Sequence, residues 1–160
     1  MIQAITETNL ITYLQTEDNR INTTVSSSHI RHLLKFTNDM DKSVEYAYGR
    51  TETITDRFTK FTFNYSTNTN VYSGLINFLP SGYWKYEVYE VIWIDTPTLA
   101  VGYAPVTETD VLSPAANDKG VVKGLVTKGK MYVADKAGTA QVQYTQRQEP
   151  SGTNYIYYGQ

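Results

Sequence analysis

Residues 83–90 read Tyr-Trp-Lys-Tyr-Glu-Val-Tyr-Glu, and this stretch decides the fold class. Successive side chains of a β-strand point to opposite faces of a sheet, so every second residue shares a face. One face carries Trp84, Tyr86 and Val88, and the other carries Tyr83, Lys85, Glu87 and Tyr89. This alternation predicts a strand with one buried face and one wet face.

Similar short runs recur along the chain and predict an all-β protein. Thr, Val, Ile and the aromatic residues, which favour strands, make up 66 of the 160 residues, whereas Leu and Ala together make up only 18. Further strands are predicted at residues 10–14, 30–37, 44–48, 58–65, 75–78, 121–126, 130–134 and 141–144. Strands at this spacing are typical of a β-sandwich or a β-barrel.

The chain has the length of one ordinary domain. We expect a β-sandwich domain over residues 1–135. Residues 95–120 contain three prolines and no long alternating run, so they are interpreted as a loop or insertion within this domain. Residues 136–160 are interpreted as a C-terminal strand and tail, which ends on an aromatic run.

Charge and composition exclude several classes of protein. The formal net charge is only −2, so we expect neither nucleic acid nor an anionic membrane surface as a partner. The chain has no cysteine, which excludes disulfides, cysteine nucleophiles and zinc–thiolate sites. No stretch approaches the ~20 apolar residues of a transmembrane helix, and no secretory signal is visible at the start.

Residues 124–130 fit the phosphate-loop pattern GxxxxGK, but the next residue departs from it. Met131 lacks the hydroxyl that would bind Mg²⁺ at that position. The residues that follow also alternate like a strand, whereas a phosphate loop must open a helix. We interpret the stretch as a β-turn between two strands, with Gly129 at a position that needs a positive φ.

No other motif supports catalysis or a bound metal. His29 and His32 would lie on opposite faces of a strand, and His32 is predicted to be half-buried with a satisfied hydrogen bond. The carboxylates in residues 38–41 are interpreted as a solvated turn. The serine-hydrolase pattern GxSxG does not occur. We therefore predict a protein that is not an enzyme and that uses no cofactor and no metal.

The remaining signal is tyrosine, with 14 residues against five Phe and two Trp. Exposed tyrosine suits a protein interface because its ring is large and its hydroxyl can form hydrogen bonds. The candidates for an exposed interface set are Tyr83, Tyr89, Tyr155, Tyr157 and Tyr158. The alternative, that most tyrosines merely cover the faces of the sandwich, stays open.

Four stretches resemble a known group of proteins. They are residues 35–40 (KFTNDM), 56–63 (DRFTKFTF), 82–90 (GYWKYEVYE) and 154–158 (NYIYY). The chain resembles small β-rich virion proteins of tailed bacteriophages, including crAss-like phages. The resemblance implies an immunoglobulin-like antiparallel β-sandwich and a role as an auxiliary or decoration protein that binds the assembled capsid and stabilises it. It further implies assembly in the host cytoplasm, a place on the capsid surface of the virion, and the major capsid protein or another virion protein as partner. A homo-oligomer, such as a trimer, would suit three-fold positions of a repeated lattice, whereas a monomer would suit single sites.

Two other functions stay open. One is a host-surface or glycan-binding module of a head fibre or tail, in which Trp93 or Tyr72 could face a sugar. The other is a small enzyme on a β scaffold, which would need a pocket with converging titratable groups.

Overall fold

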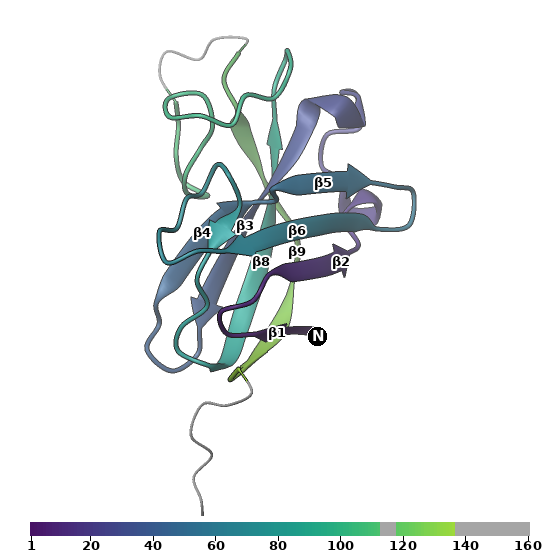
Figure 1. Cartoon of the computed structure of the whole chain (residues 1–160). Helices are drawn as coiled ribbons and strands as arrows, with labels where there is room; N and C mark the ends of the chain where they lie inside the picture. The colour runs from purple at the N-terminus through teal and green to yellow at the C-terminus, as the bar shows by residue number, and fades with distance from the viewer. Residues whose placement is uncertain (113–117, 137–160) are drawn as a thin grey trace, which may run out of the picture.

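The computed structural model describes residues 1–112 and 118–136. Its regular structure is almost entirely β, in two sheets that form a sandwich-like arrangement (Figure 1). The five-stranded sheet runs in the order β1 (Ile2–Ile5), β9 (Val121–Ala134), β8 (Gly82–Ile92), β3 (Ile30–Asn38) and β4 (Val44–Tyr48). The smaller sheet runs β2 (Leu10–Leu14), β6 (Thr59–Tyr65) and β5 (Thr51–Ile54), with β7 (Leu75–Ile76) beside β6. Two single-turn 3-10 helices, η1 (Glu17–Asn19) and η2 (Ser27–His29), precede β3. The all-β fold class is confirmed, whereas immunoglobulin-like connectivity stays a prediction.

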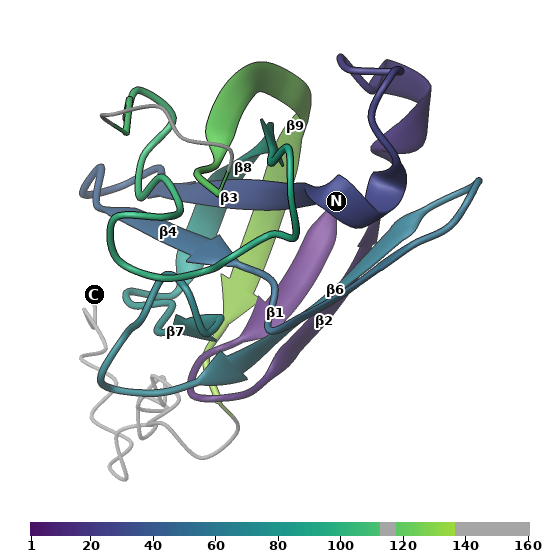
Figure 2. The ribbon, with the colours of Figure 1, turned by 90° about the horizontal axis from the view of Figure 1, so that it is seen from above.

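The main core lies between the two sheets, which face each other in Figure 2. The alternation in β8 places Trp84 and Val88 in this core, both fully buried, as predicted. Phe36 of β3 contacts Phe63 of β6 edge to face, so aromatic rings join the two layers. Within residues 1–112 and 118–136, no helix has the length and apolar character needed to cross a bilayer.

The prediction for residues 121–134 was wrong. Two strands separated by a turn at Gly129 were expected, but residues 121–134 form one strand that pairs along the whole of β8. Gly129 does not need a positive φ, because the position with that geometry is Gly124, with a φ of 150°, where the register between β8 and β9 shifts. Gly129 is required for another reason: a Cβ there would lie 2.6 Å from the hydroxyl of Tyr86.

Two strands were not predicted. β1 pairs in parallel with β9, so its partner lies about 130 residues away in the sequence. β5 reads Thr-Glu-Thr-Ile, a polar run whose place in the sheet comes from pairing with β6. Neither strand carries enough apolar alternation of its own to be recognised locally.

A second hydrophobic cluster lies on the outer face of the five-stranded sheet, under the segment of residues 95–112. Its fully or almost fully buried members are Leu33, Tyr48, Val91, Trp93 and Ala104. The Tyr48 hydroxyl donates to the carbonyl of Pro105 at 2.7 Å, and the Trp93 indole donates to the carbonyl of Tyr103 at 3.3 Å. These contacts hold the segment against part of the sheet and leave the rest of that face exposed.

Candidate protein interface

The exposed part of the outer face carries a pair of tyrosines. Tyr83 of β8 and Tyr132 of β9 are directly opposite each other in the antiparallel register. Their ring centroids are 5.1 Å apart, and the side chains are 57% and 39% exposed. Tyr83 was predicted as an interface residue, whereas Tyr132 was missed. The signal that could have found Tyr132 is the cross-strand register, which places it beside Tyr83 on the same face.

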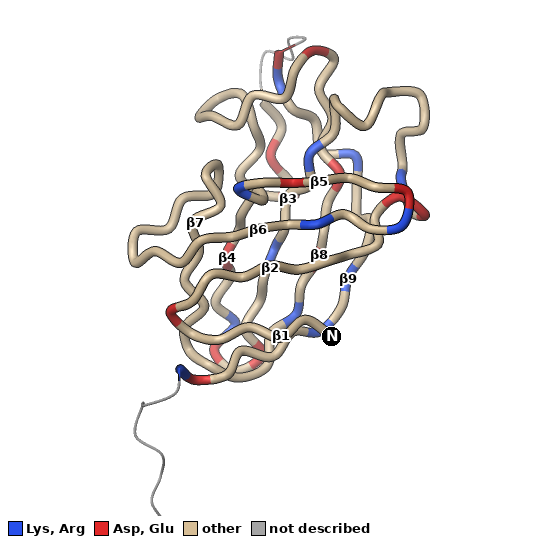
Figure 3. Tube along the Cα trace, turned by 45° about the vertical axis from the view of Figure 1, so that its right-hand side comes forward, with Lys and Arg blue, Asp and Glu red and all other residues tan. Residues whose placement is uncertain are grey.

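Lysines follow the tyrosine pair along the two strands. Lys85 and Lys130 are the next opposing pair along the same face, and Lys128 is opposite Glu87 beyond them. Figure 3 shows the basic positions of β9 in blue. Lys85 has Asp39 at 3.3 Å, while no ion-pair partner of Lys128 or Lys130 lies within the described part of the chain. Like charges directly opposite each other destabilise a sheet, so the Lys85–Lys130 pair does not stabilise the pairing of β8 with β9. We call Tyr83, Tyr132, Lys85 and Lys130 the tyrosine–lysine face.

Tyr89, the second predicted interface residue within the described part, lies differently. It is half-buried and packs against the second hydrophobic cluster, and its hydroxyl donates to Glu87 at 3.1 Å. Burial, followed by the charge of Glu87, raises the pKa of Tyr89 to about 12. Tyr89 therefore offers less free surface than Tyr83. The remaining candidates, Tyr155, Tyr157 and Tyr158, lie outside the described residues.

Glu108 anchors the covering segment beside Tyr89. Its carboxylate accepts hydrogen bonds from Lys35, at 2.5 Å, and from the Tyr46 hydroxyl. Burial by itself raises the pKa of Glu108, but these two hydrogen bonds, together with a backbone hydrogen bond and the charge of Lys35, outweigh it and lower the pKa below its ordinary value of 4.5. The hydrogen bond to Glu108 also raises the pKa of Lys35. The covering segment is thus tied to the sheet by a charged cluster as well as by apolar contacts.

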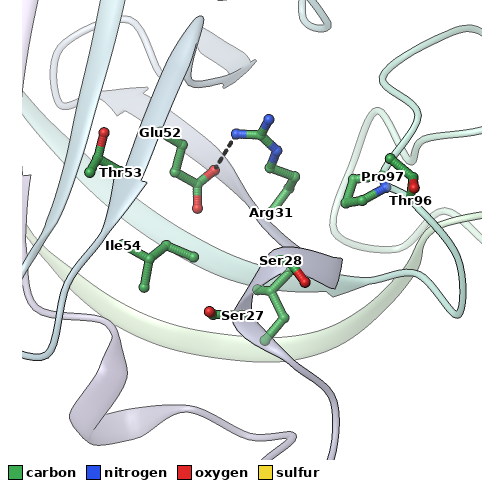
Figure 4. A pocket seen from close by; sticks show the side chains of 9 residues that line it. Ser27, Ser28, Arg31, Glu52, Thr53, Ile54, Thr96 and Pro97 are labelled. Atoms are coloured by element: carbon green, nitrogen blue, oxygen red, sulfur yellow. Dashed lines mark ion pairs between the residues drawn. The ribbon is translucent and has the colours of Figure 1, made fainter.

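A cleft of about 420 Å³ opens elsewhere on the molecule, between η2, β3, β5 and the segment after β8 (Figure 4). Residues that line it include Ser27, Ser28, Arg31, Glu52, Thr96 and Pro97. Beside it, Nδ1 of His32 lies 2.5 Å from the Glu52 carboxylate. The side chains of His32 and Glu52 are 2% and 1% exposed, so the imidazole is too buried to meet a substrate.

The other predicted sites lie in a regular strand or are buried or half-buried. The GxxxxGK stretch lies within β9, in extended backbone, and does not form a loop. Trp93, suggested as a sugar-facing residue, is fully buried, and Tyr72 is half-buried at the second cluster. Among residues 1–112 and 118–136, no three His, Asp or Glu side chains are grouped so that they could hold a metal ion.

Comparisons with family models, with curated proteins and with solved structures found no match to this chain.

Proposed function

We propose that this chain is a non-enzymatic structural protein that binds other proteins through the tyrosine–lysine face. The observation that carries the proposal is the exposed Tyr83–Tyr132 pair on a well-packed sheet. Tyrosine is enriched at protein interfaces because it buries a large ring at little cost in conformational entropy and keeps a polar tip. Both rings project from paired strands, which hold them in place before a partner arrives.

The proposed setting is the capsid of a tailed bacteriophage, where the chain would act as an auxiliary or decoration protein on the virion surface. The resemblance of residues 35–40, 56–63 and 82–90 to small virion proteins supports this setting. The partner would be the major capsid protein or another virion protein. A ligand that binds only the assembled state stabilises that state by mass action, so no active site is required.

The first test is to count copies of the chain in purified phage particles by quantitative mass spectrometry. Hundreds of copies, in a simple ratio to the shell protein, are expected for a lattice decoration protein. A few to tens of copies would contradict the decoration role and favour a fibre or tail component. Absence from the particle would overturn the virion setting.

The second test concerns the face itself. Replacing Tyr83 and Tyr132 by Ser should weaken binding to particles that lack the chain by about 2 kcal/mol or more, as for interface hot spots. Tyr13→Ser is the matched control, because Tyr13 is also 57% exposed but lies on β2 in the other sheet. The proposed face would be contradicted if the control lost as much affinity for the particles as the double variant, or if the double variant lost none.

A further inference from the structure

We propose that the cleft beside β5 binds an acidic sugar, with Arg31 holding the carboxylate of the sugar. This inference does not depend on the tyrosine–lysine face, because none of that face's residues lines the cleft. Figure 4 shows Arg31 between the residues of β5 on one side and Thr96 and Pro97 on the other. Arg31 is the basic residue among those that line the cleft.

The guanidinium of Arg31 has free hydrogen-bonding capacity. Its nearest acid is Glu52, with 3.8 Å between Arg31 Nη1 and Glu52 Oε2, which is too long for a hydrogen bond. Within the described residues, the Arg31 side chain makes no hydrogen bond, and it is 35% exposed. A guanidinium carries five N–H donors in a planar fork, and that fork matches a carboxylate in a bidentate arrangement.

Both carboxylate oxygens of Glu52 contact His32, and the negative charge of Glu52 also positions Arg31. One of its oxygens lies 2.5 Å from Nδ1 of His32, and the other accepts the backbone N–H of His32 at 3.3 Å. The buried carboxylate therefore attracts the guanidinium to the wall of the cleft without satisfying its donors. Glu52 repels any anion that binds Arg31, and it repels a doubly charged phosphate about twice as strongly as a singly charged carboxylate, so the cleft favours the carboxylate.

The rest of the lining favours a sugar. The hydroxyls of Ser27, Thr53 and Thr96 make no hydrogen bond to another described residue, and all three line the cleft. Side-chain hydroxyls can both donate to and accept from the hydroxyls of a sugar ring. Ile30, Ile54 and Pro97 supply apolar wall. The volume of about 420 Å³ falls within the ~300–1,000 Å³ typical of small-molecule sites.

The experiment is a titration of the full chain with glucuronic acid and, separately, with glucose, followed by NMR shifts of the backbone amides. The two sugars differ at one carbon, which is a carboxylate in the first and a hydroxymethyl group in the second. Glucuronic acid is expected to shift amides around the cleft, and glucose at the same concentration is not. Equal binding of both sugars, or no binding of either, would overturn the proposal.

Two variants of Arg31 test whether this residue binds glucuronic acid. Arg31→Gln should lower the affinity for glucuronic acid by about tenfold or more, the usual effect of losing a charged hydrogen-bond donor. Arg57→Gln is the matched control, because it removes the same charge from an exposed turn outside the cleft. If Arg31→Gln does not fold, Arg31→Lys keeps a positive charge beside Glu52 but lacks the fork, and its affinity should also fall. Unchanged affinity in a folded Arg31 variant would overturn the proposal.

Two further ligand titrations distinguish a sugar site from a general carboxylate site and from the tyrosine–lysine face. A short acetylated peptide with one aspartate offers the same carboxylate without a sugar ring, and tighter binding of that peptide would overturn the assignment to a sugar. The Tyr83→Ser/Tyr132→Ser variant should bind glucuronic acid as well as the unchanged chain does. A failure of the tyrosine–lysine face therefore leaves this inference standing, and the reverse also holds.

Discussion

At the scale of single residues, the buried pair of His32 and Glu52 joins the two sheets. His32 points from β3 into the core, where its ring also meets Phe61 edge to face, and Glu52 comes from β5 in the smaller sheet. His32 was predicted to be half-buried with a satisfied hydrogen bond. The hydrogen bond is present, but the residue is 2% exposed. Its partner could not be foreseen, because β5 itself was not recognised.

We predict that His32→Leu destabilises the fold by about 3 kcal/mol, since it removes the hydrogen-bond partner of the buried Glu52 carboxylate. The double variant His32→Leu/Glu52→Leu should cost clearly less than the sum of the two single variants. Unfolding in urea, monitored by tryptophan fluorescence, gives these free energies. Additive costs would mean that the two side chains stabilise the protein independently.

At the scale of elements, β9 owes its continuity to the lack of a side chain at Gly129. Tyr86 is directly opposite in β8, and its ring lies over the glycine. A Cβ at position 129 would lie 2.6 Å from the Tyr86 hydroxyl oxygen and 2.7 Å from Cζ, well inside van der Waals contact. The ring therefore occupies the space that a side chain would fill in an ordinary strand.

Gly129→Ala is accordingly expected to cost about 1–3 kcal/mol, the usual effect of overpacking a core. In a Tyr86→Ala background, the same substitution should cost little, because the ring is no longer in the way. Thermal unfolding of the four proteins of this cycle measures the coupling. If the cost is the same in both backgrounds, the effect comes from the backbone of β9 and the clash with Tyr86 is not its cause.

Local pattern predicts an element where one face of a strand meets the core and the other meets water. β2 and β6 meet that condition, and β3, β4 and β8 alternate clearly along their inner face, so the positions of all five could be predicted from the sequence to within a few residues. β1 and β5 could not, since their strand character depends on partners that local sequence does not reveal. The turn expected at Gly129 failed for a similar reason: the role of this glycine is set by a side chain on the neighbouring strand.

The candidate sites likewise divide into residues that local sequence can predict and residues that depend on distant partners. Tyr83 could be predicted because alternation within one strand places it on the wet face. Tyr132 depends on the register between β8 and β9, and the cleft brings together residues of η2, β3, β5 and the segment after β8. Trp93 was misjudged because residues 95–112 fold back over the outer face and bury it, which composition alone did not indicate.

At the scale of the whole molecule, the Glu108 cluster ties the covering segment to the five-stranded sheet. The pKa of Glu108 is lowered on folding, so its contribution to stability is present above its ordinary value of 4.5 and is lost as the pH falls through the lower folded value. The pKa of Lys35 is raised above its ordinary value of 10.5, so its contribution is present below 10.5 and is lost as the pH rises through the higher folded value.

Glu108→Gln should therefore lower stability by about 1 kcal/mol at neutral pH, where both groups are charged. The difference in Tm between the two proteins should stay roughly constant between pH 4.5 and pH 10.5 and should shrink in stronger acid. Calorimetry across this range measures it. Asp56→Asn is a control in the exposed turn after β5. A Tm difference that persists unchanged in strong acid would show that the charge of Glu108 is not what holds the segment.

The parallel pairing of β1 with β9 also has a mechanical consequence. Ile2 lies beside Met131 and Ile5 beside Ala134, so the chain enters this pair of strands at one end and leaves it at the other. A tension that draws Ile2 and Ala134 apart acts along both strands, in shear. The hydrogen bonds between β1 and β9 then bear the force together, whereas a hairpin pulled from its open end loses its hydrogen bonds one after another. The molecule is therefore expected to resist a force that draws Ile2 and Ala134 apart.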